Sequence, residues 1–147
     1  MAKAYQMNAF TRFGNTMTEA MIRLGIAPAG MYLLTVRGRK SGLPRTVPVN
    51  LIEHQGRRWL VAPYGEVAWV RNARAAGEVE LRRAGAAERA QAREASAEEA
   101  APVLRSYLRR LRLVVGSYFD VTPSSPDASF VAEAPRHPVF LLSKPPA

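Results

Sequence analysis

The sequence predicts an α+β protein whose core is a small antiparallel β-barrel of about six strands, accompanied by three helices. Short apolar runs are separated by glycine-containing turns, which is the pattern of β-hairpins. Three longer stretches carry apolar residues at helical spacing. A barrel suits such a sheet because closure leaves no strand edge exposed. With 147 residues, the chain is expected to form one domain over residues 1–147.

The first predicted element is an N-terminal helix over about residues 5–24. Met7, Met17 and Met21 recur at roughly helical spacing, and Gly25 can end the helix. The apolar face of this helix is expected to pack on the domain. Because the helix also carries arginines, a peripheral contact with a membrane surface stays open as an alternative.

Three strands are predicted next, at Met31–Val36, Thr46–His54 and Arg57–Ala62. The first two flank a basic turn and are expected to pair antiparallel, while residues 55–56 form the turn before the third. Side chains of the third strand alternate between two faces. Residues 63–65 end this strand, because they include a proline and a glycine.

A helix and a further hairpin follow. The helix is predicted at Val67–Ala76, with Gly77 at its end. Two strands, Glu78–Leu81 and Arg89–Glu94, are predicted on either side of a turn at Gly85. The second of these strands is rich in alanine and charged residues, so its local preference for a strand is weak.

The last part of the chain begins with a strong helix signal. Ser96 and Glu99 match a capping box, and the helix that they start is predicted to end near Gly116. Residues 120–138 contain four prolines and several serines, which predicts an irregular loop. Pro138–Leu142 is predicted as the final strand.

Charge and composition restrict the function. The formal net charge of +9 and the pI near 10.8 favour an anionic partner, such as an acidic cofactor. Nucleic acid is not expected, because no nucleic-acid-binding motif is recognised.

Cysteine is absent, and His54 and His137 are far apart in sequence, so a metal site is not expected. With no secretory signal and no apolar run of bilayer length, a cytoplasmic location is expected.

The most informative stretch is the basic turn, residues 37–45, in which four of nine residues are cationic and two are glycine. Glycines allow backbone N–H groups to converge in a tight turn. The side chains of Arg39, Lys40 and Arg45 add positive charge, and Ser41 adds a hydroxyl. Such a turn favours binding of a phosphate or of clustered carboxylates. The alternative is a hairpin tip with solvated charges.

Motifs for nucleophilic or nucleotide chemistry are missing from the sequence, so any chemistry is expected to come from a bound cofactor. Trp69 and Asn72 would share a helix face, where Trp69 could pack while Asn72 hydrogen-bonds; a core tryptophan beside a surface asparagine is the alternative. Tyr118 follows the long helix and could offer its hydroxyl to a ligand or cover the core. His137 is interpreted as structural.

These residues together resemble one family. Residues 34–49, with their Gly-Arg-Lys-Ser-Gly-x-x-Arg core, are similar to the signature of the deazaflavin-dependent nitroreductases, which use coenzyme F420. The similarity continues through residues 59–65, 69–75 and 136–140. The resemblance implies a split β-barrel of the FMN-binding-like type, with the cofactor across the barrel groove.

The resemblance also implies roles for particular residues. The phosphate and the oligoglutamate tail of F420 would meet the basic turn, and the segments around it would line the deazaflavin ring. Tyr118 would be a proton donor or a substrate contact. The cofactor-binding residues implied in this way are Arg39, Lys40, Ser41, Arg45, Pro48, Val49, Ala62, Pro63, Tyr64, Gly65, Trp69, Asn72 and Arg74.

The expected function is therefore hydride transfer from reduced F420 to an electron-poor small-molecule acceptor, such as a quinone, an enone or a nitro compound. The chain departs from nitroreductase members at Tyr64, where they carry a lysine, and at Gly116 and Val121, where aromatic residues would be expected. These departures concern the substrate more than the cofactor. The alternatives are an FMN-binding reductase and a non-catalytic carrier of a lipid or small ligand on the same barrel. The oligomeric state is left open.

Overall fold

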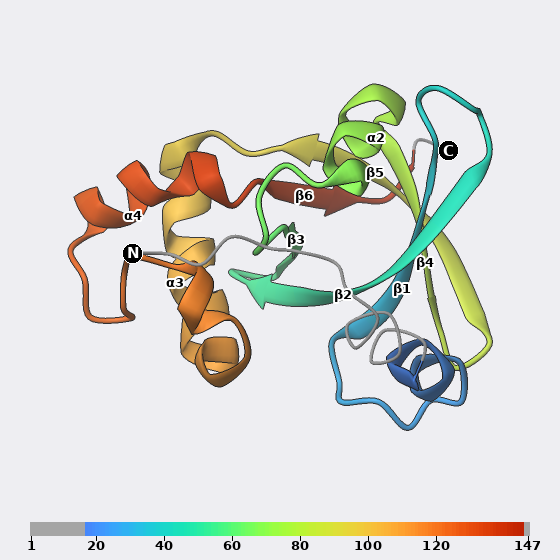
Figure 1. The fold of residues 1–147 in the computed structure, drawn as a ribbon, viewed down its shortest axis with the longest axis horizontal. Coiled ribbons are helices and arrows are strands. Elements are labelled where there is room, and N and C mark those ends of the chain that lie inside the picture. The colour runs from blue at the N-terminus through green and yellow to red at the C-terminus, as the bar shows by residue number, and fades with distance from the viewer. Residues whose placement is uncertain (1–16, 146–147) are drawn as a thin grey trace.

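The computed structural model describes residues 17–145, and six antiparallel strands in this part close into a barrel. The order around the barrel is β1-β2-β3-β6-β5-β4 (Figure 1). The expected α+β split barrel is confirmed in its main feature, the closed antiparallel sheet. The strands are β1 (Met31–Arg37), β2 (Pro44–His54), β3 (Arg57–Val61), β4 (Glu78–Arg83), β5 (Ala86–Glu94) and β6 (Val139–Ser143).

The alternation of side chains along the strands produces two hydrophobic cores. In β3, Leu60 faces the barrel interior, whereas Trp59 and Val61 face the helices outside. β6 repeats this arrangement, with Phe140 inside the barrel and Val139 outside it. Because side chains alternate with a period of two, a register shift of one residue would exchange the two cores. The hydrophobic pattern therefore fixes the register of these strands.

Three labelled helices cover the barrel, and residues 17–23 are also helical. Helix α2 (Ala68–Ala76) ends at Gly77, as the sequence predicts, and the φ of Gly77 is left-handed at 69°. Helix α3 (Ala97–Val115) begins with the predicted capping box of Ser96 and Glu99. Together with α4 (Asp127–Glu133), α3 packs on the outer side of the barrel (Figure 1).

The prediction of an irregular loop over residues 120–138 is wrong. This segment contains α4 and a short 3-10 helix, η2 (Ala134–Arg136). Pro126 occupies the N-cap of α4, and the buried Phe130 anchors that helix in the outer core. Proline is tolerated at the start of a helix because the first N–H groups have no intrahelical partner. The prolines therefore mark the ends of these short helices instead of preventing them.

The expected N-terminal helix over residues 5–24 falls mainly outside the described residues, so only its end is seen, at residues 17–23. The exposed Leu24 and the left-handed Gly25, with a φ of 75°, follow it. Across residues 17–145, no helix combines the length and the apolar character needed to cross a membrane.

Candidate functional site

The basic turn is closed by its own backbone. The Gly38 N–H donates to the Leu43 carbonyl at 2.8 Å, and the Gly42 N–H donates to the Gly38 carbonyl at 2.9 Å. Ser41 Oγ accepts a hydrogen bond from the Leu43 N–H at 3.1 Å. A Cβ on Gly38 would lie 2.9 Å from Ser41 Oγ, and Gly42 has a φ of +73°. Both glycines are therefore needed for this shape.

Helix α2 holds the turn through Asn72. The side-chain oxygen of Asn72 accepts hydrogen bonds from the Arg39 backbone N–H at 3.1 Å and from the Arg39 guanidinium at 2.8 Å. Asn72 is only 4% exposed, because it lies on the buried face of α2 beside Val70 and Ala73. Arg39 is thus fixed at both its backbone and its side chain. The structure brings together two predicted site residues that are 33 positions apart.

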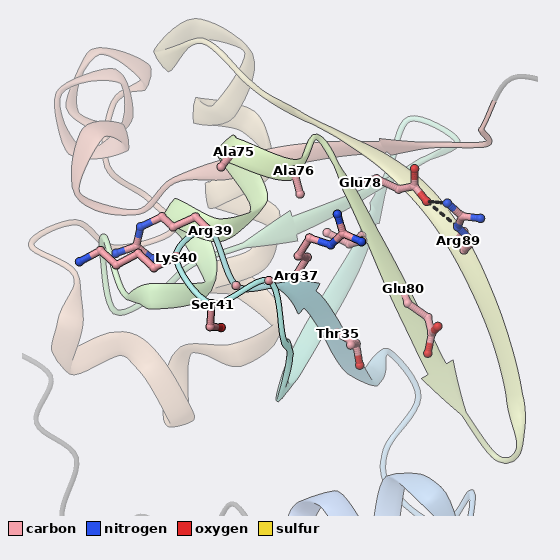
Figure 2. Close-up of a pocket in the computed structure, with 13 residues that line it drawn as sticks. Thr35, Arg37, Arg39, Lys40, Ser41, Ala75, Ala76, Glu78, Glu80 and Arg89 are labelled. Carbon is pink, nitrogen blue, oxygen red and sulfur yellow. Dashed lines mark hydrogen bonds and ion pairs between the residues drawn. The ribbon is translucent and has the colours of Figure 1, made fainter.

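A cavity of about 950 Å³ opens between the basic turn, the end of α2 and strand β4. Figure 2 shows Arg37 projecting into this space, while Arg39 and Lys40 extend together on the other side of the turn. Ala75 and Ala76 of α2 complete the lining near the turn. Because these two side chains are small, they leave the space above the turn open.

The acidic side chains around this cavity form ion pairs, whereas several of the basic ones do not. Two carboxylates line it from β4, and both are paired: Glu78 with Arg89, and Glu80 with Arg82 at 3.5 Å. Arg37 and Lys40 make no ion pair with any residue in the part of the chain that the structure describes. The same holds for the exposed Arg45 among residues 17–145. The net effect is a positive turn beside locally neutralised acids.

A second group of predicted residues includes the loop before α2. Tyr64 lies in the loop before α2, and Tyr118 lies in the 3-10 helix η1 (Gly116–Tyr118) after α3. Their rings pack edge to face, with centroids 4.8 Å apart. Tyr107 of α3 lies nearby and is buried; burial raises its pKa, and the neighbouring Tyr64 contributes to the same shift. We call Tyr64, Tyr107, Tyr118 and Phe119 the aromatic end.

Several other predicted residues support the barrel. The side chains of Val49 and Ala62 are enclosed in the barrel interior, at 8% and 0% exposure. Trp69 packs against the same core, with its ring 5.9 Å from that of Phe140. Pro48, Pro63 and Gly65 are half-buried. Trp69 is also half-buried, so it and the last three residues retain surface through which a ligand could be contacted.

The guanidinium of Arg74 is fully engaged in ion pairs within the protein. It pairs with Glu66 at 2.7 Å and with Glu94, to which it donates two hydrogen bonds of 2.7 and 2.8 Å. These bonds, that to Glu94 foremost, raise the pKa of Arg74. Its charge is therefore balanced locally, in contrast to the charges of the basic turn. The geometry places Arg74 in a structural cluster that ties α2 to β5.

Sequence reasoning missed the β4 side of the cavity. Glu78 and Glu80 face the turn because β4 pairs with β1, with Thr35 opposite Glu80. These two strands are separated by two other strands and a helix, so no local pattern predicts their pairing. A signal was present in part: Thr35 and Arg37 are the outward residues of an alternating strand, and Glu78 and Glu80 alternate in the same way.

Comparison with solved structures supports the fold. A putative 5-nitroimidazole antibiotic resistance protein from Bacteroides thetaiotaomicron is 13% identical, with 86% of this chain and 77% of that chain covered and a TM-score of 0.50. A Clostridium acetobutylicum protein related to general stress protein 26 of B. subtilis, of the pyridoxinephosphate oxidase family, is 9% identical, with 79% and 75% covered and a TM-score of 0.50. Both share the fold, which is a split β-barrel.

A third solved structure, of an F420-H2 dependent reductase (FDR-A), is 28% identical to this chain. The match covers 78% of this chain and 95% of that one, with a TM-score of 0.49. None of the curated proteins matches the chain. The model of the family described as F420H(2)-dependent quinone reductase matches residues 7–122, which is most of the sequence. The chain therefore belongs to the F420H2-dependent quinone reductase family, and its cofactor is F420H2.

Proposed function

We propose that the protein reduces quinones and activated alkenes, with nitro compounds as poorer acceptors, and that it binds F420 through the basic turn. The observation that carries the proposal is a turn held by Asn72, whose cations make no ion pair with any described residue and which borders a large cavity. The family description, which names quinones, supports the acceptor class. Hydride transfer is the chemistry that bound, reduced F420 supplies.

The residues of the turn fit the anionic part of F420. A phosphate and a chain of carboxylates need several cationic or N–H donors in a fixed arrangement. Lys40 and Arg45 supply charge, and Arg39 is oriented by Asn72. The N–H groups of Lys40 and Ser41 make no hydrogen bond with another residue of the described range 17–145, so they can donate to a ligand. The donor set is thus that of a polyanion site.

Pro48, Pro63 and Gly65 would contact the ring system. Pro48, Pro63 and Gly65 have accessible surface and few rotatable bonds, so contact with them orients a flat ligand at small entropic cost. Val49 and Ala62 support this surface from the barrel interior, and the half-buried Trp69 packs on the same core from α2. In this arrangement, binding energy from the tail would fix the position of a distant reacting centre.

At the aromatic end, Tyr64 and Tyr118 would bound the space for the acceptor. Both rings are partly exposed, so they can cover an apolar substrate and exclude water from it. The Tyr118 hydroxyl would hold the proton that an acceptor oxygen takes up as its bond order falls. Quinones and enones carry such an oxygen, and the family description, which names quinones, supports placing them ahead of nitro compounds.

The cofactor arm of the test is a fluorescence titration. The chain has two tryptophans. Trp59 is buried in the outer core, and Trp69 lies on α2. In a Trp59→Phe variant, oxidised F420 is expected to quench Trp69 saturably, and FMN serves as the parallel ligand. Absence of quenching by F420 would refute binding beside α2.

The acceptor arm follows oxidation of F420H2 in the presence of a naphthoquinone, a cyclic enone or a nitroaromatic compound. We expect the largest kcat/KM for the quinone or the enone. A clear preference for the nitroaromatic compound would contradict the proposed acceptor class while leaving the cofactor site intact.

A further inference from the structure

His137 is buried beneath the aromatic end, and nothing in the proposed function uses it. It is 2% exposed and lies between η2 and β6. Both ring nitrogens are within hydrogen-bonding distance of an acceptor: Nδ1 is 2.8 Å from the Pro63 carbonyl, and Nε2 is 2.6 Å from Glu133 Oε2. A carbonyl oxygen can only accept, so Nδ1 carries the hydrogen and donates a hydrogen bond to the Pro63 carbonyl.

His137 contacts a residue next to each of the two tyrosines, Tyr64 and Tyr118. Pro63 directly precedes Tyr64, and its carbonyl is bound by His137. Phe119 directly follows Tyr118, and its ring stacks on the imidazole with centroids 3.8 Å apart and planes 12° apart. The rings of Tyr64 and Tyr118 also contact each other, so the two segments are linked both through His137 and directly. One buried side chain thus touches both segments that carry the pair.

Glu133, the hydrogen-bond partner of His137 Nε2, is itself held in place by other hydrogen bonds. Glu133 is 5% exposed and accepts hydrogen bonds from the Arg136 guanidinium at 2.9 and 3.0 Å. The Asp120 backbone N–H also donates to Glu133, at 3.3 Å. Arg136 in turn binds the Asp120 carboxylate at 2.7 Å. A carboxylate held by several donors keeps the imidazole from rotating.

The neighbouring backbone adds to the same connection. The Ala62 N–H donates to the Pro138 carbonyl at 2.8 Å, so residues on both sides of the 137–138 peptide bond hold the segment after β3. A Cβ on Gly65 would lie 3.4 Å from the Arg136 carbonyl oxygen. The loop that carries Tyr64 therefore packs directly on the segment that carries His137.

We propose that His137 is a positioning residue that sets the relative orientation of Tyr64 and Tyr118, and through them the acceptor pocket. The role in turnover rests on the proposed function, whereas the role in geometry does not. A histidine that only filled space would need neither of its two polar contacts, and a hydrophobic residue of similar size would replace it.

Two variants separate the hydrogen bonds of His137 from its stacking on Phe119. His137→Phe keeps an aromatic ring against Phe119 but removes both nitrogens and therefore the bond to Pro63. Phe119→Leu keeps those hydrogen bonds and removes the stacked ring. His54→Phe is the matched control, because His54 is half-buried and binds Ser106 Oγ at 3.1 Å, on α3.

The first measurement is NMR of the cofactor-free full chain, with thermal unfolding to confirm that each variant is folded. We expect the cross-relaxation signals between the Tyr64 and Tyr118 rings to weaken in His137→Phe and in Phe119→Leu, and to persist in His54→Phe. If they persist in folded His137→Phe, the proposal is overturned. If that variant does not fold, persistence of the ring contact in Phe119→Leu overturns it.

The second measurement is steady-state reduction of a naphthoquinone together with the Kd for F420. In His137→Phe, we expect kcat to fall roughly tenfold because the groups around the acceptor are displaced, while the Kd for F420 stays unchanged. An equal loss of F420 affinity would contradict a positioning role confined to the aromatic end. Absence of turnover in the unaltered protein would refute the proposed function, and the NMR result would still decide the geometric claim.

Discussion

The basic turn, which Asn72 of α2 holds, and the aromatic end, which includes the loop before α2, are built in opposite ways. The turn is exposed, and Lys40 and Arg45 have no ion-pair partner among residues 17–145. Beneath the aromatic end, the buried polar groups His137 and Glu133 are hydrogen-bonded to each other. The turn is thus prepared to gain contacts from a ligand, whereas the aromatic end has its internal contacts already made.

This difference separates two tasks. Unpaired cations on a rigid frame provide affinity for an anion, because the frame is ordered before the ligand arrives. Buried and satisfied groups provide orientation, because their side chains have one arrangement. We therefore expect substitutions in the turn to change Kd and substitutions at the aromatic end to change kcat.

The largest effect is expected for Lys40→Ala/Arg45→Ala. Each charge-assisted hydrogen bond contributes about 1.5 kcal/mol, so the Kd for F420 should rise roughly 100-fold, with little change in thermal stability. Fluorescence titration at fixed salt measures this change. Arg57→Ala/Arg109→Ala removes the same charge from exposed sites elsewhere and is the control. An equal loss in the control would mean that net charge, not the turn, attracts the cofactor.

A smaller effect is expected for Asn72→Ala. The substitution removes the part-buried acceptor of the Arg39 N–H and guanidinium, which costs about 1 kcal/mol of folding free energy and loosens the turn. Denaturant unfolding measures the stability, and titration measures the weaker binding of F420. Asn72→Asp keeps an acceptor at the same place and should recover most of the stability. If Asn72→Ala left both quantities unchanged, α2 would not be the support of the turn.

At the aromatic end, Tyr118→Phe should lower kcat about fivefold, as expected for loss of one hydrogen bond of ~1 kcal/mol in the transition state. The Kd for F420 should not change. Steady-state kinetics with a quinone acceptor measure the first quantity and titration the second. Unchanged kcat would remove the Tyr118 hydroxyl from the reaction and leave its ring as a wall of the pocket.

The smallest effect is expected at the start of α3, which belongs to neither region. The hydrogen bond from Arg93, followed by that from the Ser96 backbone, lowers the pKa of Glu99 from 4.5 to about 2. A lowered pKa in the folded state means stability that is present above pH 4.5 and is lost as the pH falls toward 2. Glu99→Gln should remove this part of the acid dependence in unfolding curves, without changing F420 binding at neutral pH. A changed Kd would show that the two regions are not independent of α3.

The sequence predicts those parts of the molecule that depend on local signals. The capping box at Ser96, the end of the helix at Gly77 and the tight turn at Gly38 are each determined by neighbouring residues, and each is confirmed. Contacts distant in sequence could not be predicted in the same way. The bond between Arg39 and Asn72 and the pairing of Thr35 with Glu80 depend on how the barrel closes.

Helix α4 shows the limit of composition as a guide. Pro126 and its neighbours suggest a loop, but burial of Phe130 in the outer core stabilises a short helix between the prolines. His137 shows a related limit. The sequence suggests a structural residue, and only the folded chain brings its two nitrogens to Pro63 and Glu133.

The most direct test of the account compares F420 with the same deazaflavin lacking its phosphate and oligoglutamate tail. We predict that the intact protein binds F420 roughly 100-fold more tightly than the truncated ligand, and that Lys40→Ala/Arg45→Ala abolishes this difference by weakening F420 alone. Equal affinity for the two ligands in the intact protein would contradict the central claim. An unchanged ratio in the variant would place the tail site elsewhere on the molecule.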